Sequence, residues 1–145
     1  MATHTFFNKF NMEETFFTRV GCMDGRVLGP VSRFGKEKFH AEYPDTIAEA
    51  GEVGILAHNP PGDVLFNLKQ ELDVSIDKHR SRGVVVHGHE DCAANPVDEV
   101  LHIEDIRKSV EVVRDLVHGK VPVVGVFVRR ATDSTNDWMV EEIEE

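Results

Sequence analysis

Two cysteines and one histidine have the residue types and spacing of a metal site. Cys22 stands apart in the chain, whereas His89 and Cys92 are three positions from each other, so one tight turn could point both side chains at a single ion. Thiolate and imidazole groups suit zinc, and a catalytic zinc takes three such ligands and keeps its fourth position for water or substrate. Cys22, His89 and Cys92 are therefore the candidate zinc ligands.

Asp24 and Arg26 follow the first cysteine within the segment CMDGR. A guanidinium group can bind both oxygens of a carboxylate, so we expect these two side chains to pair beside the metal. The simpler interpretation is a turn-forming aspartate before Gly25 and an arginine on the surface. We favour the pair, with Asp24 and Arg26 as the candidate catalytic residues.

Short apolar runs predict the strands that would hold these residues. The runs 18–23 and 84–86 each lead into one of the two cysteine motifs, and a third run covers 121–128. The β-branched run 84–86 is typical of a strand that is buried on both faces. Residues 45–50 form a weaker candidate strand, which brings the expected sheet to about four strands.

Apolar residues at helical spacing predict amphipathic helices over 64–82 and 103–117. Strands that alternate with helices predict an α/β fold with three layers, in which helices cover both faces of a mostly parallel central sheet. We expect residues 1–145 to form one domain. The acidic C-terminal run, from Glu141 to Glu145, is interpreted as a solvated helix end.

Parallel sheets bind ligands outside the carboxyl ends of their strands. Both cysteines fall at the carboxyl ends of predicted strands, so neighbouring parallel strands would bring Cys22 and Cys92 to the same edge of the sheet. The fold therefore predicts that two motifs far apart in the sequence form one site.

Charge and hydropathy argue against two classes of partner, nucleic acids and membranes. Acidic residues outnumber basic ones by 26 to 16, which disfavours nucleic acid, because phosphate binding needs clustered Lys and Arg. No apolar run approaches the roughly 20 residues that cross a bilayer, so no membrane partner is expected. With two cysteines and no export signal, a disulfide framework is improbable, and we expect a cytoplasmic protein.

The segments CMDGR and HEDC resemble the CxDxR and HxxC signatures of the β-class carbonic anhydrases. The resemblance implies that Cys22, His89 and Cys92 bind zinc, with Asp24 and Arg26 as a dyad beside the bound water. The implied activity is the reversible hydration of CO2 to bicarbonate by zinc-bound hydroxide. In some family members the aspartate itself ligates zinc, so Asp24 has two open roles.

The chain departs from the family in one segment and resembles a small, divergent branch of it. Where the family has a sequence close to RNAGN, residues 49–52 read EAGE, so only the Ala-Gly step matches. On this ground a zinc-binding protein without turnover stays open as a second function. An enzyme acting on COS or CS2 also stays open, because these molecules offer the same electrophilic carbon as CO2. A further alternative is a thiol enzyme in which Cys22 or Cys92 is the nucleophile.

The remaining histidines and aromatics receive structural interpretations. We expect His87 to be packed or hydrogen-bonded, His79 to serve core packing or a subunit contact, and His102 to be a surface residue or proton carrier. Five phenylalanines cluster near the N-terminus, at positions 6, 7, 10, 16 and 17. Family members exchange N-terminal segments across a dimer, so the resemblance implies a homodimer.

Overall fold

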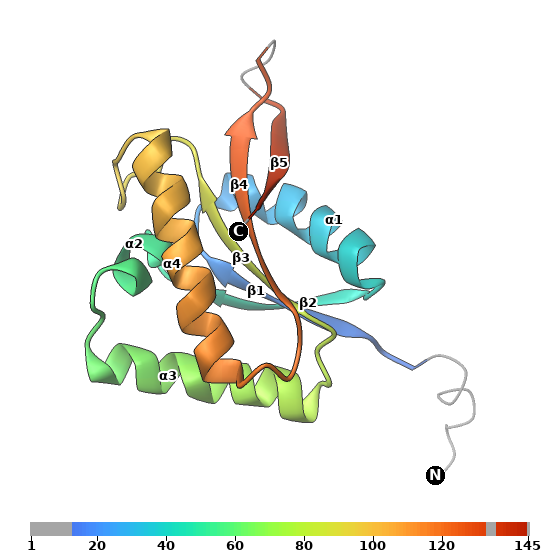
Figure 1. Cartoon of the computed structure of the whole chain (residues 1–145). Coiled ribbons are helices and arrows are strands. Elements are labelled where there is room, and N and C mark those ends of the chain that lie inside the picture. Colours follow the sequence, from blue (N-terminus) through green and yellow to red (C-terminus); the bar gives the residue numbers. More distant parts are fainter. Residues whose placement is uncertain (1–12, 133–135, 145) are drawn as a thin grey trace.

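A five-stranded sheet forms the centre of the structure, a computed structural model that describes residues 13–132 and 136–144 (Figure 1). The strand order is β2-β1-β3-β4-β5, and only the last pair is antiparallel. This confirms the expected α/β class with a mostly parallel sheet. The bounds are β1 (Phe16–Gly21), β2 (Tyr43–Ala48), β3 (Val84–His89), β4 (Val123–Arg130) and β5 (Trp138–Ile143).

Helices cover both faces of the sheet, as the predicted layers require (Figure 1). One apolar core joins α2 (Glu52–Ala57), α3 (Gly62–Asp73) and α4 (Glu99–Val117) to one face. A second core packs α1 (Leu28–Phe39) on the other face, where β5 also contributes side chains. Burial of apolar side chains on both faces is the main favourable term that holds the strands in register.

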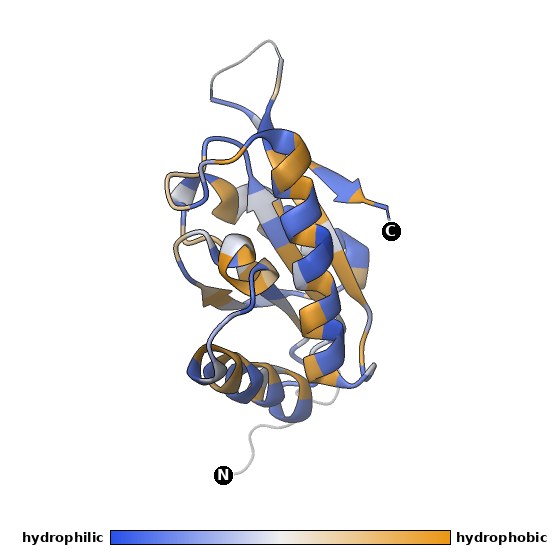
Figure 2. Cartoon of the chain, turned by 60° about the vertical axis from the view of Figure 1, so that its left-hand side comes forward, coloured by the Kyte–Doolittle hydropathy of each residue, from blue (hydrophilic) through white to orange (hydrophobic). Residues whose placement is uncertain are grey.

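The elements that the two strongest sequence patterns predict, β3 and α4, are present in the structure. Val84, Val85 and Val86 of β3 are fully buried, because they alternate between the two cores. Along α4, Ile106, Val110 and Val113 form the buried stripe, and hydrophobic and hydrophilic residues are interleaved along this helix in Figure 2. Continuous β-branched runs and helical periodicity therefore predicted the elements nearest the centre.

The first of the two predicted helices is shorter than expected. It was predicted over 64–82, but α3 ends at Asp73 and a π-helical turn (Val74–Lys78) follows. The hydroxyl of Thr18 in β1 is hydrogen-bonded to Ser75 at 2.6 Å and to Ser81 at 2.7 Å. These buried bonds anchor the chain after α3 to the sheet, so it leaves the regular helical path.

The C-terminal segment is a strand, so its interpretation as a helix end is wrong. Trp138 and Val140 of β5 pack against the second core, and Glu141 lies within bonding reach of Arg129 on β4. Side chains alternate across the edge strand, which lets the acidic residues face solvent and basic neighbours. The sheet therefore has five strands rather than about four.

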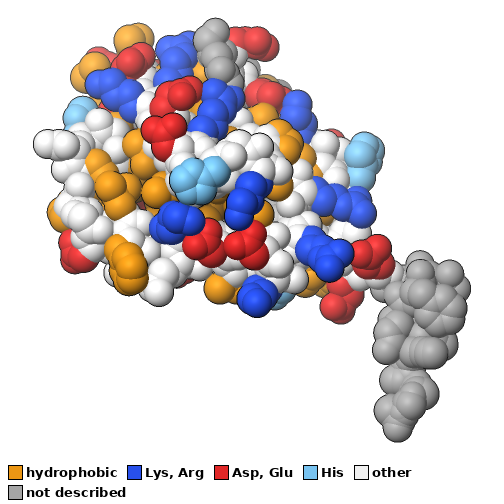
Figure 3. Space-filling view, turned by 60° about the horizontal axis from the view of Figure 1, so that its bottom comes forward, with side chains coloured by type: hydrophobic (Ala, Val, Ile, Leu, Met, Phe, Trp, Pro, Cys, Tyr) orange, Lys and Arg blue, Asp and Glu red, His pale blue; other side chains and the backbone are white. Residues whose placement is uncertain are grey.

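The described surface carries charges of both signs. Seen from the side of α3, Lys and Arg side chains are interspersed with Asp and Glu side chains and with hydrophobic ones (Figure 3). Within residues 13–132 and 136–144, no helix is long and apolar enough to cross a membrane.

The contact between α1 and β1 gives the first testable prediction. A Cβ added at Gly35 would lie 2.1 Å from the Phe17 ring, whereas one at Gly29, in the same helix, would meet nothing closer than an Arg33 nitrogen at 3.5 Å. We expect Gly35→Ala to lower the free energy of unfolding by about 1–3 kcal/mol, because the buried ring has no space to move into. Urea unfolding measures this change.

Gly29→Ala is the matched control. It should leave the stability unchanged or raise it by up to about 1 kcal/mol, since alanine favours helix over glycine. Equal effects of the two substitutions would contradict the packing of Phe17 against α1.

Candidate metal centre

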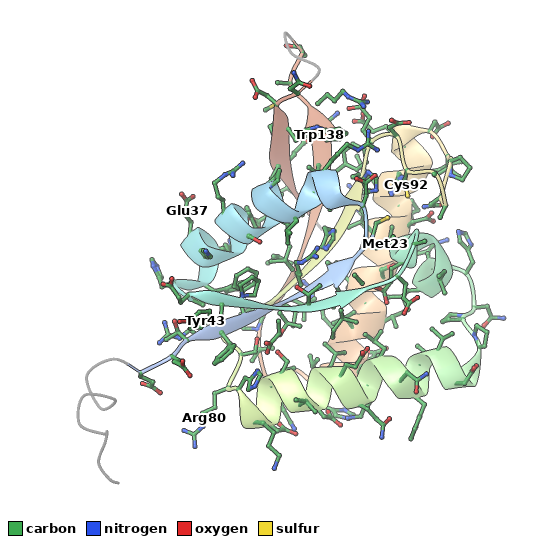
Figure 4. The ribbon with its side chains drawn as sticks, turned by 180° about the vertical axis from the view of Figure 1, so that it is seen from behind. Met23, Glu37, Tyr43, Arg80, Cys92 and Trp138 are labelled. Atoms are coloured by element: carbon green, nitrogen blue, oxygen red, sulfur yellow. The ribbon has the colours of Figure 1, made fainter. Side chains whose placement is uncertain are left out.

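Neighbouring strands bring the three candidate ligands together. Cys22 follows the last residue of β1, His89 ends β3, and Gly21 lies opposite His87 in the parallel pairing of these strands. One potential ligand atom from each of Cys22, His89 and Cys92 lies within 4.8 Å of the other two, and all three residues are buried. Figure 4 shows Met23, next to Cys22 in the chain, at the same end of the molecule as Cys92.

The two thiols are close but not bonded to each other. The Sγ atoms of Cys92 and Cys22 are 3.9 Å apart, and both cysteines are free. Burial raises the pKa of the Cys92 thiol, and the neighbouring Cys22 raises it further. A raised pKa disfavours Cys92 as a nucleophile in the absence of a neighbouring cation, because a nucleophilic cysteine needs its thiolate form stabilised.

The imidazole of His89 is held in one orientation. Its Nδ1 lies 2.7 Å from the carbonyl oxygen of Glu90, so Nδ1 carries the proton and donates it to that oxygen. The other nitrogen, Nε2, is buried and has no hydrogen-bond partner among the described residues. A backbone acceptor that fixes the tautomer and leaves the second nitrogen free is typical of a histidine that binds a metal.

Gly51, in the connection between β2 and α2, is hydrogen-bonded to the first cysteine. Its backbone N–H donates to the Cys22 sulfur at 3.4 Å. Gly51 has a φ of 63°, and a Cβ there would lie 2.8 Å from the carbonyl oxygen of Ala94. Only glycine fits this position without strain.

Asp24 and Arg26 form a two-pronged ion pair at the edge of the cluster. The Arg26 Nε donates to Asp24 Oδ1 at 3.0 Å, and an Nη atom donates to Oδ2 at 2.7 Å. The Arg26 backbone N–H also donates to Oδ1. These bonds hold the pKa of Asp24 down at about 2, so the side chain is a carboxylate at neutral pH. Its Oδ2 lies 3.9 Å from His89 Nε2.

Arg26 also ties the two motifs to each other. It donates to the side chain of Asp91 at 3.1 Å and to the Asp91 carbonyl oxygen at the same distance. Asp91 has a φ of 60° and makes the turn between His89 and Cys92. The guanidinium also lies over the ring of Trp138 on β5, 4.9 Å from its centroid, and Figure 4 labels this tryptophan.

His102 is the main residue near the cluster that sequence reasoning misplaced. It was expected at the surface, but it is buried, with its ring centroid 6.4 Å from that of His89. The available signal was its position four residues before Ile106, on the buried stripe of α4. His87 is packed as expected: burial lowers its pKa to about 3, and it is hydrogen-bonded to Arg19 at 3.2 Å.

A cavity of about 530 Å³ lies beside His89 and is lined by His102, Phe127 and Arg129 among others. It is large enough for a small molecule and combines one aromatic wall with polar groups. The arrangement can hold one ion on two sulfurs and one nitrogen, with a carboxylate beside it and space for a small substrate nearby.

Fold and cluster together define an α/β protein of the β-carbonic anhydrase type with a candidate metal site. The β-carbonic anhydrase isoform I of Trichomonas vaginalis is similar in structure, with a TM-score of 0.52 at 18% identity over 92% of this chain and 90% of that one. A tetrameric β-carbonic anhydrase of Sordaria macrospora gives a TM-score of 0.57 at 13% identity, over 97% and 86% of the two chains.

A comparison of the sequence with known families identifies the family of this chain. Residues 12–144 match the family described as "Putative carbonic anhydrase", and the chain belongs to that family. No curated protein is significantly similar to it in sequence.

The Asp24–Arg26 pair predicts a titration that can be measured. We expect Arg26→Ala to raise the pKa of Asp24 from about 2 toward its ordinary value of about 3.9, because the hydrogen bonds from the guanidinium are the main cause of the lowered pKa. Carboxyl carbon NMR of the metal-free, reduced protein follows this group directly. Arg33→Ala, an exposed arginine on α1, is the control and should leave the titration of Asp24 unchanged.

The same shift predicts a pH dependence of stability. Because the pKa of Asp24 is lower in the folded than in the unfolded state, its stabilising effect is complete above roughly pH 4 and is lost as the pH falls toward about 2. The Arg26→Ala protein should therefore lose less stability than the unmodified protein across this interval. An unchanged Asp24 titration in Arg26→Ala would contradict the pair.

Proposed function

We propose that this protein is a zinc-dependent lyase that catalyses the reversible hydration of CO2 to bicarbonate. The proposal is carried by one observation: the potential ligand atoms of Cys22, His89 and Cys92 lie within 4.8 Å of one another, with the Asp24–Arg26 pair at their edge. The family and the fold support the same reaction class.

The donor set supports zinc as the metal. Two thiolates at about 2.3 Å from a tetrahedral zinc would be separated by roughly 3.8 Å, and the Cys22 and Cys92 sulfurs are 3.9 Å apart. The buried Nε2 of His89 lacks a partner among the described residues, and such an atom is costly unless something binds it. Soft sulfur donors with one imidazole favour zinc over magnesium or calcium.

When bound, zinc would supply the acidity that makes a water molecule a nucleophile at neutral pH. The residues of the chain would orient and position the reactants. Glu90 fixes the His89 ring through its carbonyl oxygen, and Gly51 donates a hydrogen bond to the Cys22 sulfur. The ionised Asp24 is a hydrogen-bond acceptor that can hold a proton of the attacking water and direct its lone pair toward CO2.

The geometry favours Asp24 as an acceptor over Asp24 as a fourth ligand. Both of its carboxylate oxygens accept hydrogen bonds from Arg26, which in turn is anchored to Asp91. Ligation would require the carboxylate to give up at least part of this bonding. Arg26 is thus the proposed positioning residue, since it acts through Asp24.

A zinc protein without turnover is the second candidate. Residues 49–52 favour it, because they differ from the family segment that follows the first motif. COS and CS2 share the electrophilic carbon of CO2 and stay open as substrates. Bound zinc together with no CO2 hydration would rule out the first candidate and leave the other two.

We also propose that the protein is a cytoplasmic homodimer. The described part of the N-terminal aromatic cluster packs on its own chain: Phe17 lies in the core, and Phe16 stacks on His79. Phe6, Phe7 and Phe10 lie outside the described residues. Self-association is supported by exposed Val100 and Leu101 at the start of α4 and by the tetrameric Sordaria relative.

Metal content tests the proposed ligands. Purified protein should hold one zinc per chain, and Cys22→Ser, His89→Ala and Cys92→Ser should each lower zinc affinity strongly, since three protein ligands are the minimum for a catalytic site. His118→Asn is the control, because His118 lies at the far end of α4 and has a φ of 53° that asparagine tolerates. Elemental analysis after dialysis measures the zinc. Full occupancy in Cys92→Ser would refute the assignment.

Stopped-flow CO2 hydration tests turnover on the same zinc-loaded samples. Asp24→Asn and Arg26→Lys should retain zinc but lower kcat/KM by roughly 10–100-fold, because each disturbs the group that orients the water. Arg33→Ala should match the unmodified enzyme. A zinc-loaded protein no faster than Cys92→Ser would rule out CO2 hydration and leave the non-catalytic zinc protein and the enzyme acting on COS or CS2.

A further inference from the structure

A second, acidic cavity lies between the end of β2, α2 and α3. It has a volume of about 180 Å³ and is lined by the carboxylates of Glu49, Glu52 and Glu71, the amide of Asn67 and apolar side chains. None of the proposed zinc ligands lines it. No lysine or arginine is among its described lining residues. Glu49 and Glu71 are exposed at its rim, whereas Glu52 is buried.

Glu52 is the unusual member of this group. Only 3% of its surface is exposed, and its Oε1 atom has no hydrogen-bond partner among the described residues. Burial raises the pKa of Glu52 to about 8, and the charges of Glu49 and Glu71 contribute. A buried carboxyl group that is neither paired nor fully hydrogen-bonded destabilises a fold, so a bound cation would offset this cost.

We propose that this cavity binds a hydrated divalent cation of the Mg²⁺ type, with Glu52 as a direct ligand. Carboxylate and amide oxygens are hard donors that suit Mg²⁺ rather than zinc. Glu49 and Glu71 balance the remaining charge, and the Asn67 amide offers a further oxygen.

The spread of the donors favours a cation that keeps part of its water. Within the described residues, the three carboxylates do not converge as closely as Cys22, His89 and Cys92 do. Ca²⁺ needs six to eight oxygens close around it, whereas Mg²⁺ retains several waters and takes only one or two carboxylates. A cavity of about 180 Å³ has room for an ion with several water molecules.

Binding of Mn²⁺, a spectroscopic substitute for Mg²⁺, tests the proposal on the full zinc-loaded chain. Electron paramagnetic resonance at neutral pH should show one saturable Mn²⁺ site that Mg²⁺ displaces. Glu52→Gln should weaken this site at least tenfold, because glutamine keeps the shape but cannot release a proton to become the anionic ligand that the cation would bind. Glu37→Gln is the control, since Glu37 is exposed on α1, away from α2 and α3 (Figure 4), and should bind Mn²⁺ like the unmodified protein.

Thermal unfolding gives a second measurement. Mg²⁺ should raise the unfolding midpoint of the unmodified protein and of Glu37→Gln, but not that of Glu52→Gln. Should Glu52→Gln fail to fold, the more exposed Glu71→Gln replaces it and is expected to bind Mn²⁺ more weakly. The proposal would be overturned by the absence of a saturable Mn²⁺ site in the unmodified protein, or by cavity variants that bind Mn²⁺ as tightly as the unmodified protein does. Either result would leave Glu52 as a protonated acid beside water.

Discussion

The parallel pairing of β1 with β3 is the constraint on which the candidate metal centre depends. It sets Gly21 opposite His87, so Cys22, which directly follows β1, and His89, the last residue of β3, meet at one edge of the sheet within reach of one ion. Shifting this register by one residue would turn every side chain of one strand to the other face. The burial of Val84, Val85 and Val86 between two cores makes such a shift costly.

Arg26 then fixes the loops that leave this edge. It bonds Asp24 in its own motif and Asp91 in the second, and its guanidinium lies over Trp138 of the antiparallel edge strand. Three segments distant in sequence are thereby held by one side chain. The low pKa of Asp24 is a consequence of the same bonding, so the structural clamp and the proposed acceptor of the water proton are one interaction.

The sequence predicted the parts of the fold that carry strong local patterns. Continuous β-branched residues predicted β3, and regular apolar spacing predicted α4, whereas α1 contains Gly29, Pro30 and Gly35 and shows no clear pattern. The three candidate ligands followed from residue type and spacing. The burial of His102 could have been predicted from its spacing to Ile106, but the proximity of His102 and Trp138 to the site could not, because it depends on how α4 and β5 pack.

Residues 49–52, where the chain departs most from its family, include one position that the structure restricts to glycine and two positions that line a cavity. Gly51 is fixed by the Cys22 sulfur on one side and by the Ala94 backbone on the other, so no other residue fits there. Glu49 and Glu52 instead line a cavity that the proposed zinc ligands do not reach. Neither of these two side chains is hydrogen-bonded to the Cys22 sulfur, which accepts from the Gly51 backbone. The divergence of residues 49–52 is therefore compatible with an intact metal centre, which weakens the case that this segment alone abolishes turnover.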